Sequence, residues 1–577
     1  MKQKLSLLLM FGLLLGFSSC NLFEKDETDK IIQINDDVTQ ATVWQAGNVY
    51  IIDGSLSIKA DIIIEAGAEI RFNQGASIHV AYYSDNYAKI VANGTAEKPI
   101  RFTSNASSPV AGNWETIGFY AGAENSEFTH CIFEYGGSND NYGAMYINST
   151  SVKFTNCQFI KMANSAIRLN DNGFFSEFTN NSFSLIEKHA IRIESNKVHT
   201  IGINNTFDLN ERYGIEVSKN FNIAGDYTWL THATPYIVAD NIYIGAEGNG
   251  INLTINPGVK LQFITNAGFV VAYPNSEYAK IIAKGTEQNP ILFTSNHPSP
   301  QAGSYMGLSF YDGSQQSVFE YCTIEYAGKE DNNSAIYINS TAIKFNNCKF
   351  DHNLNNTIRL KDSGYFTAFT NNTFSNVVHY PIEIEANYVH TIGAGNTFNS
   401  GAFGILVEEN LDKSGSFTWL KHDAPYVINH EIVIGAEGNG ATLIIAPGTT
   451  LKFNIEKGFT FGYHSNNYGK IIAEGTVAEP IIFTSSKTVP GKGDWKGIYL
   501  YASSNGSSMK HCEVLYAGSD FNYGAIMLDD TGLNTITIDN SRIAYSASYG
   551  ISVDSNSSVD ISTDTFDNNN GADYHER

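Results

Sequence analysis

The sequence predicts an all-β fold, a single-stranded, right-handed parallel β-helix built from three tandem modules. Three observations predict it: a long segment recurs at a spacing of about 190 residues, short apolar–polar alternations fill each copy, and no long stretch has helical periodicity. A coil of such a solenoid buries its inner face only by stacking on its neighbours, so coils occur in arrays. The right-handed sense follows from the usual handedness of parallel crossover connections.

The repeat is clearest in one motif, in which a lysine is followed by Gly-Thr, Pro-Ile and Phe-Thr-Ser. The motif starts at Lys89, again at Lys280 and again at Lys470. Its spacing divides the chain after residue 40 into three modules, at 41–217, 218–407 and 408–577. We expect the polar residues 564–577 to shield the open end of the last module or to be disordered.

Within a module, strand-like alternation is interrupted by tight turns. From Leu253 to Phe263, apolar and polar residues alternate on both sides of a Pro-Gly turn. A finer period of about 25 residues fits one coil carrying two or three short strands. The join between modules at 241–245 is itself strand-like, which favours one continuous solenoid over three separate sandwiches.

The N-terminus carries a targeting signal. Two lysines precede an apolar run, Leu5 to Phe17, that is too short to span a membrane as a mature helix. The run ends in Ser-Ser-Cys20, which resembles the lipobox of bacterial lipoproteins. This resemblance implies a signal peptide at 1–19, lipidation of Cys20 and an acidic linker at 20–40. We therefore expect an outer-membrane protein, exposed at the cell surface and held to the membrane through its lipid anchor only.

Charge and cysteine content restrict the possible partners. A formal net charge of −23 argues against a nucleic-acid partner, because phosphate binding needs clustered Lys and Arg. The pairs Cys131/Cys157 and Cys322/Cys348 each span 26 residues, about one coil. Buried free thiols, which pack as small hydrophobes, and disulfides between adjacent coils both fit this spacing. We expect the protein to be a monomer.

A family resemblance rests on several motifs together: Trp with Pro-Tyr, Leu-Thr-Ile-x-Pro-Gly, Gly-Thr with Pro-Ile-x-Phe-Thr-Ser, and Trp-x-x-Ile. The last occurs at Trp114 and Trp495, whereas the second module has Tyr305 there. The combination resembles the right-handed parallel β-helix repeats of bacterial surface proteins, which share the pectate-lyase-like fold. The resemblance covers nearly the whole mature chain, but it implies no activity, because this fold hosts lyases, hydrolases and adhesins.

No catalytic constellation is recognisable, and we assign no catalytic residue. The Asn-Thr-Asp, Gly-His-Gly and Arg-Ile-Lys motifs of polygalacturonase-like hydrolases and the Trp-Ile-Asp-His segment of many pectate lyases are absent from the sequence. Glu383 and Glu385 alternate with isoleucines on one expected strand face, where they could bind Ca²⁺ or act as acid and base. A solvated strand face explains the same pattern. Ca²⁺ is the one cofactor that the sequence suggests.

The aromatic residues are more suggestive. Tyr87, Tyr278 and Tyr468 stand two residues before each repeated lysine, with further tyrosines and asparagines nearby. Such rings can stack on sugars, although stacking along the solenoid is a competing explanation. Three near-copies favour avidity over a single active site. We expect a non-catalytic surface protein that presents an extended binding face to glycan or mediates adhesion. The alternative is a polysaccharide lyase or glycoside hydrolase acting on acidic polysaccharide in a β-helix groove.

Overall fold

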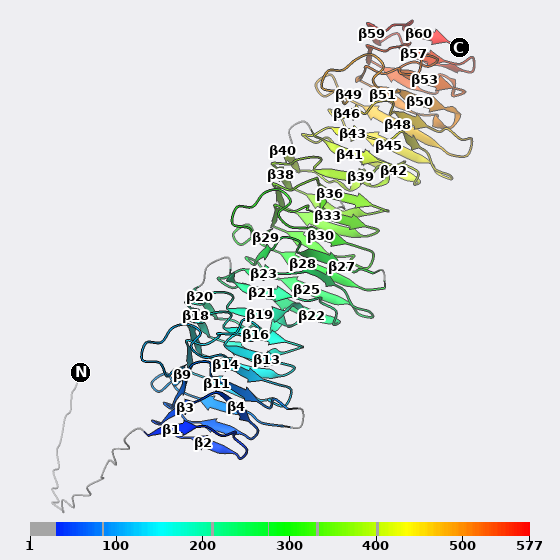
Figure 1. The fold of residues 1–577 in the computed structure, drawn as a ribbon. Coiled ribbons are helices and arrows are strands. Elements are labelled where there is room, and N and C mark those ends of the chain that lie inside the picture. Colours follow the sequence, from blue (N-terminus) through cyan, green and yellow to red (C-terminus); the bar gives the residue numbers. More distant parts are fainter. Residues whose placement is uncertain (1–29, 84–85, 209–212, 275, 330–333, 400–402) are drawn as a thin grey trace, which may run out of the picture.

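The computed structural model describes residues 30–83, 86–208, 213–274, 276–329, 334–399 and 403–577. These residues form one elongated parallel β-helix (Figure 1), which confirms the predicted fold class. Cys20, the expected signal peptide at 1–19 and most of the expected linker lie outside the described residues. No helix among the described residues is long and apolar enough to cross a membrane.

Each coil runs through three faces in a fixed order, and the strands of successive coils pair in parallel. In the first module the first face is an eight-stranded sheet, whose strands are β1 (Ile31–Ile34), β3 (Val49–Ile52), β6 (Glu69–Phe72), β9 (Ile100–Ser104), β12 (Cys131–Glu134), β15 (Gln158–Ile160), β18 (Ser182–Ser184) and β20 (Thr206–Asp208). The third face holds β2 (Thr42–Trp44), β5 (Ile62–Ile64), β8 (Ile90–Asn93), β11 (Ser126–Thr129), β14 (Ser151–Thr155) and β17 (Phe174–Thr179).

A 14-stranded sheet joins the first two modules. Its lower half is the second face of module 1: β4 (Ser55–Ile58), β7 (Ser77–Val80), β10 (Ile117–Phe119), β13 (Met145–Asn148), β16 (Ile167–Asn170), β19 (Ile191–Glu194) and β21 (Ile215–Ser218). Its upper half is the first face of module 2: β23 (Tyr236–Val238), β26 (Lys260–Phe263), β29 (Ile291–Ser295), β32 (Cys322–Glu325), β35 (Lys349–Asp351), β38 (Thr373–Ser375) and β40 (Thr397–Asn399).

A 13-stranded sheet joins modules 2 and 3 in the same way. The second face of module 2 supplies β24 (Asn241–Ile244), β27 (Gly268–Val271), β30 (Gly307–Phe310), β33 (Ser334–Asn339), β36 (Asn356–Lys361), β39 (Ile382–Glu385) and β41 (Ile405–Glu408). The first face of module 3 supplies β43 (Tyr426–Ile428), β46 (Thr450–Phe453), β49 (Ile481–Ser485), β52 (Cys512–Leu515), β56 (Arg542–Ala544) and β59 (Thr565–Asp567).

The remaining elements complete modules 2 and 3. The third face of module 2 is β22 (Gly225–Trp229), β25 (Ile251–Ile255), β28 (Ala279–Lys284), β31 (Val318–Glu320), β34 (Ala342–Asn346) and β37 (Tyr365–Thr370). Module 3 adds its third face, β42 (Gly415–Trp419), β45 (Ala441–Ile445), β48 (Gly469–Glu474), β51 (Ser508–Lys510) and β55 (Thr537–Asp539), with β54 (Gly532–Leu533) paired to β58 (Ser557–Ser558). Its second face is β44 (Ile432–Ile434), β47 (Phe459–Phe461), β50 (Ile498–Tyr501), β53 (Ile526–Asp529), β57 (Ile551–Val553) and β60 (Tyr574–Glu576). Short 3₁₀ turns occur at η1 (Ser195–Thr200), η3 (Ala386–Thr391) and η4 (Ala502–Ser504).

Each module is displaced sideways on the one before it. β21 of the second face pairs with β23 of the next module's first face, with Ile215 opposite Tyr236, and β41 pairs with β43 in the same way. Figure 1 shows the result as a staircase in which β20 and β40 lie at the same margin of their modules. The modules therefore repeat by translation, and equivalent residues lie on the same side of the rod.

The repeated Trp-Leu-x-His motif with Pro-Tyr marks these steps. Trp229 and Tyr236 are buried at the first step, and the Tyr236 hydroxyl donates a 2.7 Å hydrogen bond to the carbonyl oxygen of Leu230. Tyr426 makes the same bond to Leu420 at the second step. The motif is therefore explained by packing where one module joins the next.

Stacked side chains hold the coils together inside. On the first face of module 1, ring centroids of Phe102, Phe133, Phe159 and Phe183 follow one another at 4.8, 5.1 and 4.8 Å. The five cysteines among the described residues are buried free thiols, so the expected alternative of disulfides between adjacent coils is not adopted there. Burial raises the pKa of the Cys131 thiol, as does its neighbour Cys157. These thiols pack as part of the core.

The ends of the solenoid differ from the sequence boundaries in one respect. β1 pairs with β3 across residues 31–34, so the solenoid begins inside the segment 20–40 that we expected to be a linker. Alternation over only four residues was too short to separate a strand from a linker by sequence. At the other end, β59 and β60 form the last coil, and the Arg577 guanidinium donates to Asp529 on β53, two coils below, at 3.1 Å.

Candidate functional site

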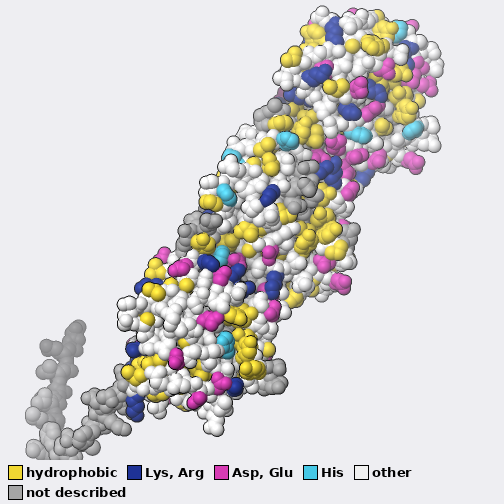
Figure 2. All heavy atoms as spheres, viewed as in Figure 1, with side chains coloured by type: hydrophobic (Ala, Val, Ile, Leu, Met, Phe, Trp, Pro, Cys, Tyr) yellow, Lys and Arg dark blue, Asp and Glu magenta, His cyan; other side chains and the backbone are white. Residues whose placement is uncertain are grey.

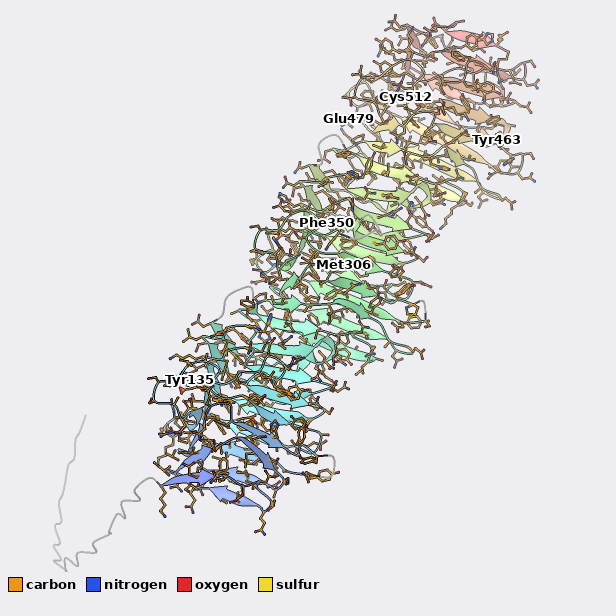
Figure 3. All side chains as sticks on the ribbon, in the orientation of Figure 1. Tyr135, Met306, Phe350, Tyr463, Glu479 and Cys512 are labelled. Carbon is orange, nitrogen blue, oxygen red and sulfur yellow. The ribbon has the colours of Figure 1, made fainter. Side chains whose placement is uncertain are left out.

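The three tyrosines singled out in the sequence lie in equivalent connections, from the second face to the third face of each module. Tyr87 follows β7, Tyr278 follows β27 and Tyr468 follows β47. Their side chains are 80, 51 and 50% exposed, respectively. Because the modules repeat by translation, the three connections emerge on the same side of the rod, where Figure 3 labels the nearby Tyr463.

A second tyrosine set recurs in all three modules at the start of the same connections. The first tyrosine of each pair comes just after a second-face strand, and its partner lies on the coil above. The ring centroids are 4.8, 4.8 and 4.9 Å apart in the pairs Tyr82/Tyr120, Tyr273/Tyr311 and Tyr463/Tyr501. Sequence reasoning noted further tyrosines near Tyr87, Tyr278 and Tyr468, which include the first member of each pair, and missed the second member. The signal was available, because the two tyrosines are 38 residues apart in every module.

These pairs extend along the second face. The ring of Tyr120 lies 6.0 Å from that of Tyr146, and Tyr311 lies 5.9 Å from Tyr337. Asn148 donates to the Tyr146 hydroxyl at 3.0 Å, which fixes the ring orientation. Figure 2 shows hydrophobic side chains, a class that there includes tyrosine, gathered in patches on the visible face and separated by polar surface. We call the three Tyr pairs, with these extensions, the tyrosine face.

The ionisation state of the inner tyrosines is fixed by their surroundings. Burial raises the pKa of Tyr120, and it raises the pKa of Tyr501 to about 12. Both hydroxyls therefore stay protonated at neutral pH and can donate hydrogen bonds. The outer members, Tyr82, Tyr273 and Tyr463, are 53, 47 and 53% exposed. Tyrosine is common at hydrated binding surfaces, because its ring offers an apolar contact and its hydroxyl offers a hydrogen bond.

Modules 2 and 3 also build a hollow beside Tyr278 and Tyr468. In module 2 the glycine-rich turn 245–250 lies against Tyr278, whose N–H donates to the carbonyl oxygen of Ala246 at 2.9 Å. Gly250 has φ +67°, and a Cβ there would lie 2.5 Å from the Tyr278 carbonyl oxygen, so only glycine lets the turn approach so closely. The turn 435–440 holds Tyr468 in the same way.

Module 1 has no such turn. Only residues 59–61 connect its strands β4 and β5, where module 2 uses the six residues 245–250 between β24 and β25. This shorter connection explains why Tyr87 is more exposed than Tyr278 and Tyr468. The three tyrosines that the sequence makes equivalent are therefore divided by the structure into one open ring and two rings that line hollows.

Of the pair Glu383 and Glu385, only Glu383 departs clearly from the solvated face that alternation predicted; Glu385 is half-buried and accepts from the N–H of Ser363 at 3.2 Å. Glu383 is only 5% exposed, because its carboxylate is covered by cations from the preceding coil. It pairs with Lys361 at 2.7 Å and with Arg359 at 3.1 Å. Asn356 donates to it at 2.6 Å. A Ca²⁺ ion would have to displace these partners, and no three acidic, His or Cys side chains among the described residues form a metal-binding group.

One family model matches the chain in three segments, one for each module. The model of the pectate-lyase-like β-helix domain matches residues 36–159, 222–369 and 413–560, one segment in each module. The chain belongs to this family. No curated protein and no solved structure matches it. Family membership establishes the fold of this pectate-lyase-like β-helix and leaves its ligand open.

One charged cluster sets the first module of this pectate-lyase-like β-helix apart. Glu216 accepts from Arg192 at 2.7 Å and lies 3.1 Å from Nε2 of His189, while Lys188 pairs with Asp140 at 3.3 Å. Burial lowers the pKa of His189, which keeps its ring neutral near pH 7. Module 2 replaces the central three residues by Tyr380, Glu383 and Leu406, so the arrangement is not repeated there.

Proposed function

We propose that this β-helix is a non-catalytic, lipid-anchored protein of the bacterial outer-membrane surface that presents the tyrosine face to glycan. The observation that carries the proposal is the recurrence of one tyrosine pair, at 4.8 to 4.9 Å, in three modules that share an orientation. A single reaction centre requires one copy of its residues. Several weak contacts on one rigid body instead raise the apparent affinity through effective concentration, which repeated equivalent sites exploit.

The anchor follows from the sequence motif at Cys20, and the ligand class follows from the chemistry of the tyrosines. Exposed rings offer flat apolar faces, and protonated hydroxyls with nearby amides offer hydrogen bonds, a combination suited to sugars. Ca²⁺ is not required by the tyrosine face. Lipidation is tested by labelling cells with a fatty acid and comparing the wild type with Cys20→Ser, which should lose the label and its membrane association.

Glycan binding is tested by electrophoresis of the purified protein through gels loaded with neutral or acidic polysaccharides. Replacing Tyr82, Tyr273 and Tyr463 together by alanine should weaken retention at least about tenfold, because all three modules lose a stacking ring. The matched control replaces Tyr135, Tyr326 and Tyr516, another equivalent set, which lies at the ends of first-face strands. Retention that is equal in the two triple variants, or absent from the wild type with every polysaccharide, would rule out the proposal.

A second candidate function is cleavage of acidic polysaccharide by a lyase or hydrolase mechanism. The His189–Glu216–Arg192 cluster favours it, since a neutral imidazole can accept a proton and module 2 does not repeat the cluster. The test incubates wild type and His189→Ala with acidic polysaccharides, with and without Ca²⁺, and measures reducing ends and unsaturated products. Cleavage by the wild type that His189→Ala abolishes would establish the enzyme and overturn the non-catalytic proposal.

A further inference from the structure

The hollows of modules 2 and 3 have the same construction. Each is bounded by a glycine-rich turn, a half-exposed tyrosine, and a lysine two residues after it: Tyr278 with Lys280, and Tyr468 with Lys470. Asn249 and Asn439 add an amide at the equivalent place in each turn. Because the two hollows arise in separate modules from the same residues, chance placement of one side chain does not explain them.

Charge distinguishes the hollows from the rest of the molecule. Acidic residues outnumber basic ones 59 to 36 in the chain, yet no acidic side chain lines either hollow. Across the part of the chain that the structure describes, neither Lys280 nor Lys470 forms an ion pair, whereas other lysines such as Lys421 do. An ammonium group without a counter-charge, next to an aromatic ring, is complementary to an anionic ligand that also has a ring.

The spacing of the two hollows points to one extended ligand. Seven coils separate β25 from β45, which gives a rise of roughly 34 Å along the coil stack at about 4.8 Å for each strand spacing, and the sideways step between modules 2 and 3 adds to this distance. Both hollows open from the same corner of their modules, between the second and third faces. A polymer that fills one hollow is therefore held close to the other, and its second contact is intramolecular.

We infer that the two hollows bind anionic sugar units, bearing carboxylate or sulfate, of a single polysaccharide chain. Lys280 and Lys470 bind the acidic groups, and Tyr278 and Tyr468 stack on the sugar rings. This inference rests on the proposed glycan-binding function and narrows it to an acidic polymer held at two points. The overall charge of −23 disfavours unspecific binding of polyanions, so retention of such a polymer reports a local site.

The test compares retention in gels containing polygalacturonate, dextran sulfate or neutral dextran. Lys280→Gln or Lys470→Gln alone should weaken retention by the acidic polymers roughly 10- to 100-fold, since one point of attachment remains, and the double variant should lose it. Lys89→Gln, at the equivalent position of module 1, is the matched control and should bind as wild type does. Polygalacturonate and dextran sulfate separate carboxylate from sulfate recognition.

The outcomes separate this inference from the function on which it rests. The inference about the two hollows would be overturned if the double variant kept its retention by acidic polymers, or if only neutral dextran retained the wild type. In both cases the glycan-binding function would still stand. Absence of retention by any polysaccharide would overturn both. Raised NaCl should weaken the acidic retention of the wild type, because exposed charges are screened. Circular dichroism checks that each variant stays folded.

Discussion

His232 and His422 occupy equivalent places at the two steps between modules. The ring of His232 lies 5.7 Å from that of Phe207, and the ring of His422 lies 5.5 Å from Phe398. Burial lowers the pKa of each imidazole to about 4, and neither Nε2 atom has a hydrogen-bond partner among the described residues. Each step therefore contains a base that the folded protein keeps neutral.

This environment predicts loss of stability in mild acid. The folded pKa of about 4 lies below the ordinary value of 6.5. The contribution of each neutral histidine to the free energy of unfolding is therefore complete above pH 6.5 and is lost as the pH falls towards 4. Each histidine contributes at most about 3 kcal/mol. We expect His232→Phe with His422→Phe to flatten the fall in Tm between pH 6.5 and 4.5, measured by calorimetry, while His297→Phe at an exposed site should not. Identical pH profiles for all three proteins would contradict the assignment.

At the scale of residues, sequence reasoning located the side chains better than their surroundings. The equivalence of Tyr87, Tyr278 and Tyr468 was visible from spacing alone. The burial of Glu383 was not, because its partners Arg359 and Lys361 come from the preceding coil, and alternation along one strand carries no information about the strand beneath it. The hollows were also missed, because the close approach of the turn 245–250 to Tyr278 joins two successive coils and is not visible in the local sequence.

At the scale of elements, buried asparagines tie one coil to the next. Asn372 accepts from the N–H of Cys348 at 2.9 Å and donates to the carbonyl oxygen of Phe345 at 3.0 Å. Its own N–H donates to Asn396 on the coil above at 2.9 Å. Asn181 and Asn205 repeat this arrangement in module 1. The amides thus satisfy the turn backbone between third-face and first-face strands.

Replacing Asn372 by alanine should therefore cost about 3 kcal/mol, because a buried N–H and a buried carbonyl lose their partners together. Asn399→Ala, at an exposed position at the end of β40, should change stability by less than about 0.5 kcal/mol. Urea denaturation followed by circular dichroism measures both variants. A midpoint for Asn372→Ala equal to that of Asn399→Ala would show that the amide bonds are not needed.

The strands themselves were predictable, and the way modules join was not. Alternation around Leu253 and Phe263 fixed both the strands and their inward faces, and β25 and β26 form there. The sideways step depends instead on which strand β23 pairs with. That pairing is a long-range choice between two columns of similar apolar strands, and local sequence patterns do not distinguish them.

At the scale of the whole molecule, contacts run mainly between neighbouring coils, so damage should stay local. Phe345 is fully buried in β34 and stacks on Phe319 at 5.0 Å. Phe345→Ala should cost about 3–5 kcal/mol. We expect hydrogen exchange followed by mass spectrometry to show faster exchange in β31 to β37 and unchanged exchange in β5 to β11. A uniform increase across all modules would instead indicate a single cooperative unit.

The sideways displacement of successive modules has a geometric consequence for anything bound along the rod. Equivalent points in the three modules lie on a line that is oblique to the coil stacking direction, because every module adds a lateral shift to its rise. A straight polymer that touches all three tyrosine pairs must then cross the molecule at a slant. Many copies bound to one fibre would adopt a common tilt, and orientation would be imposed without any contact between the copies.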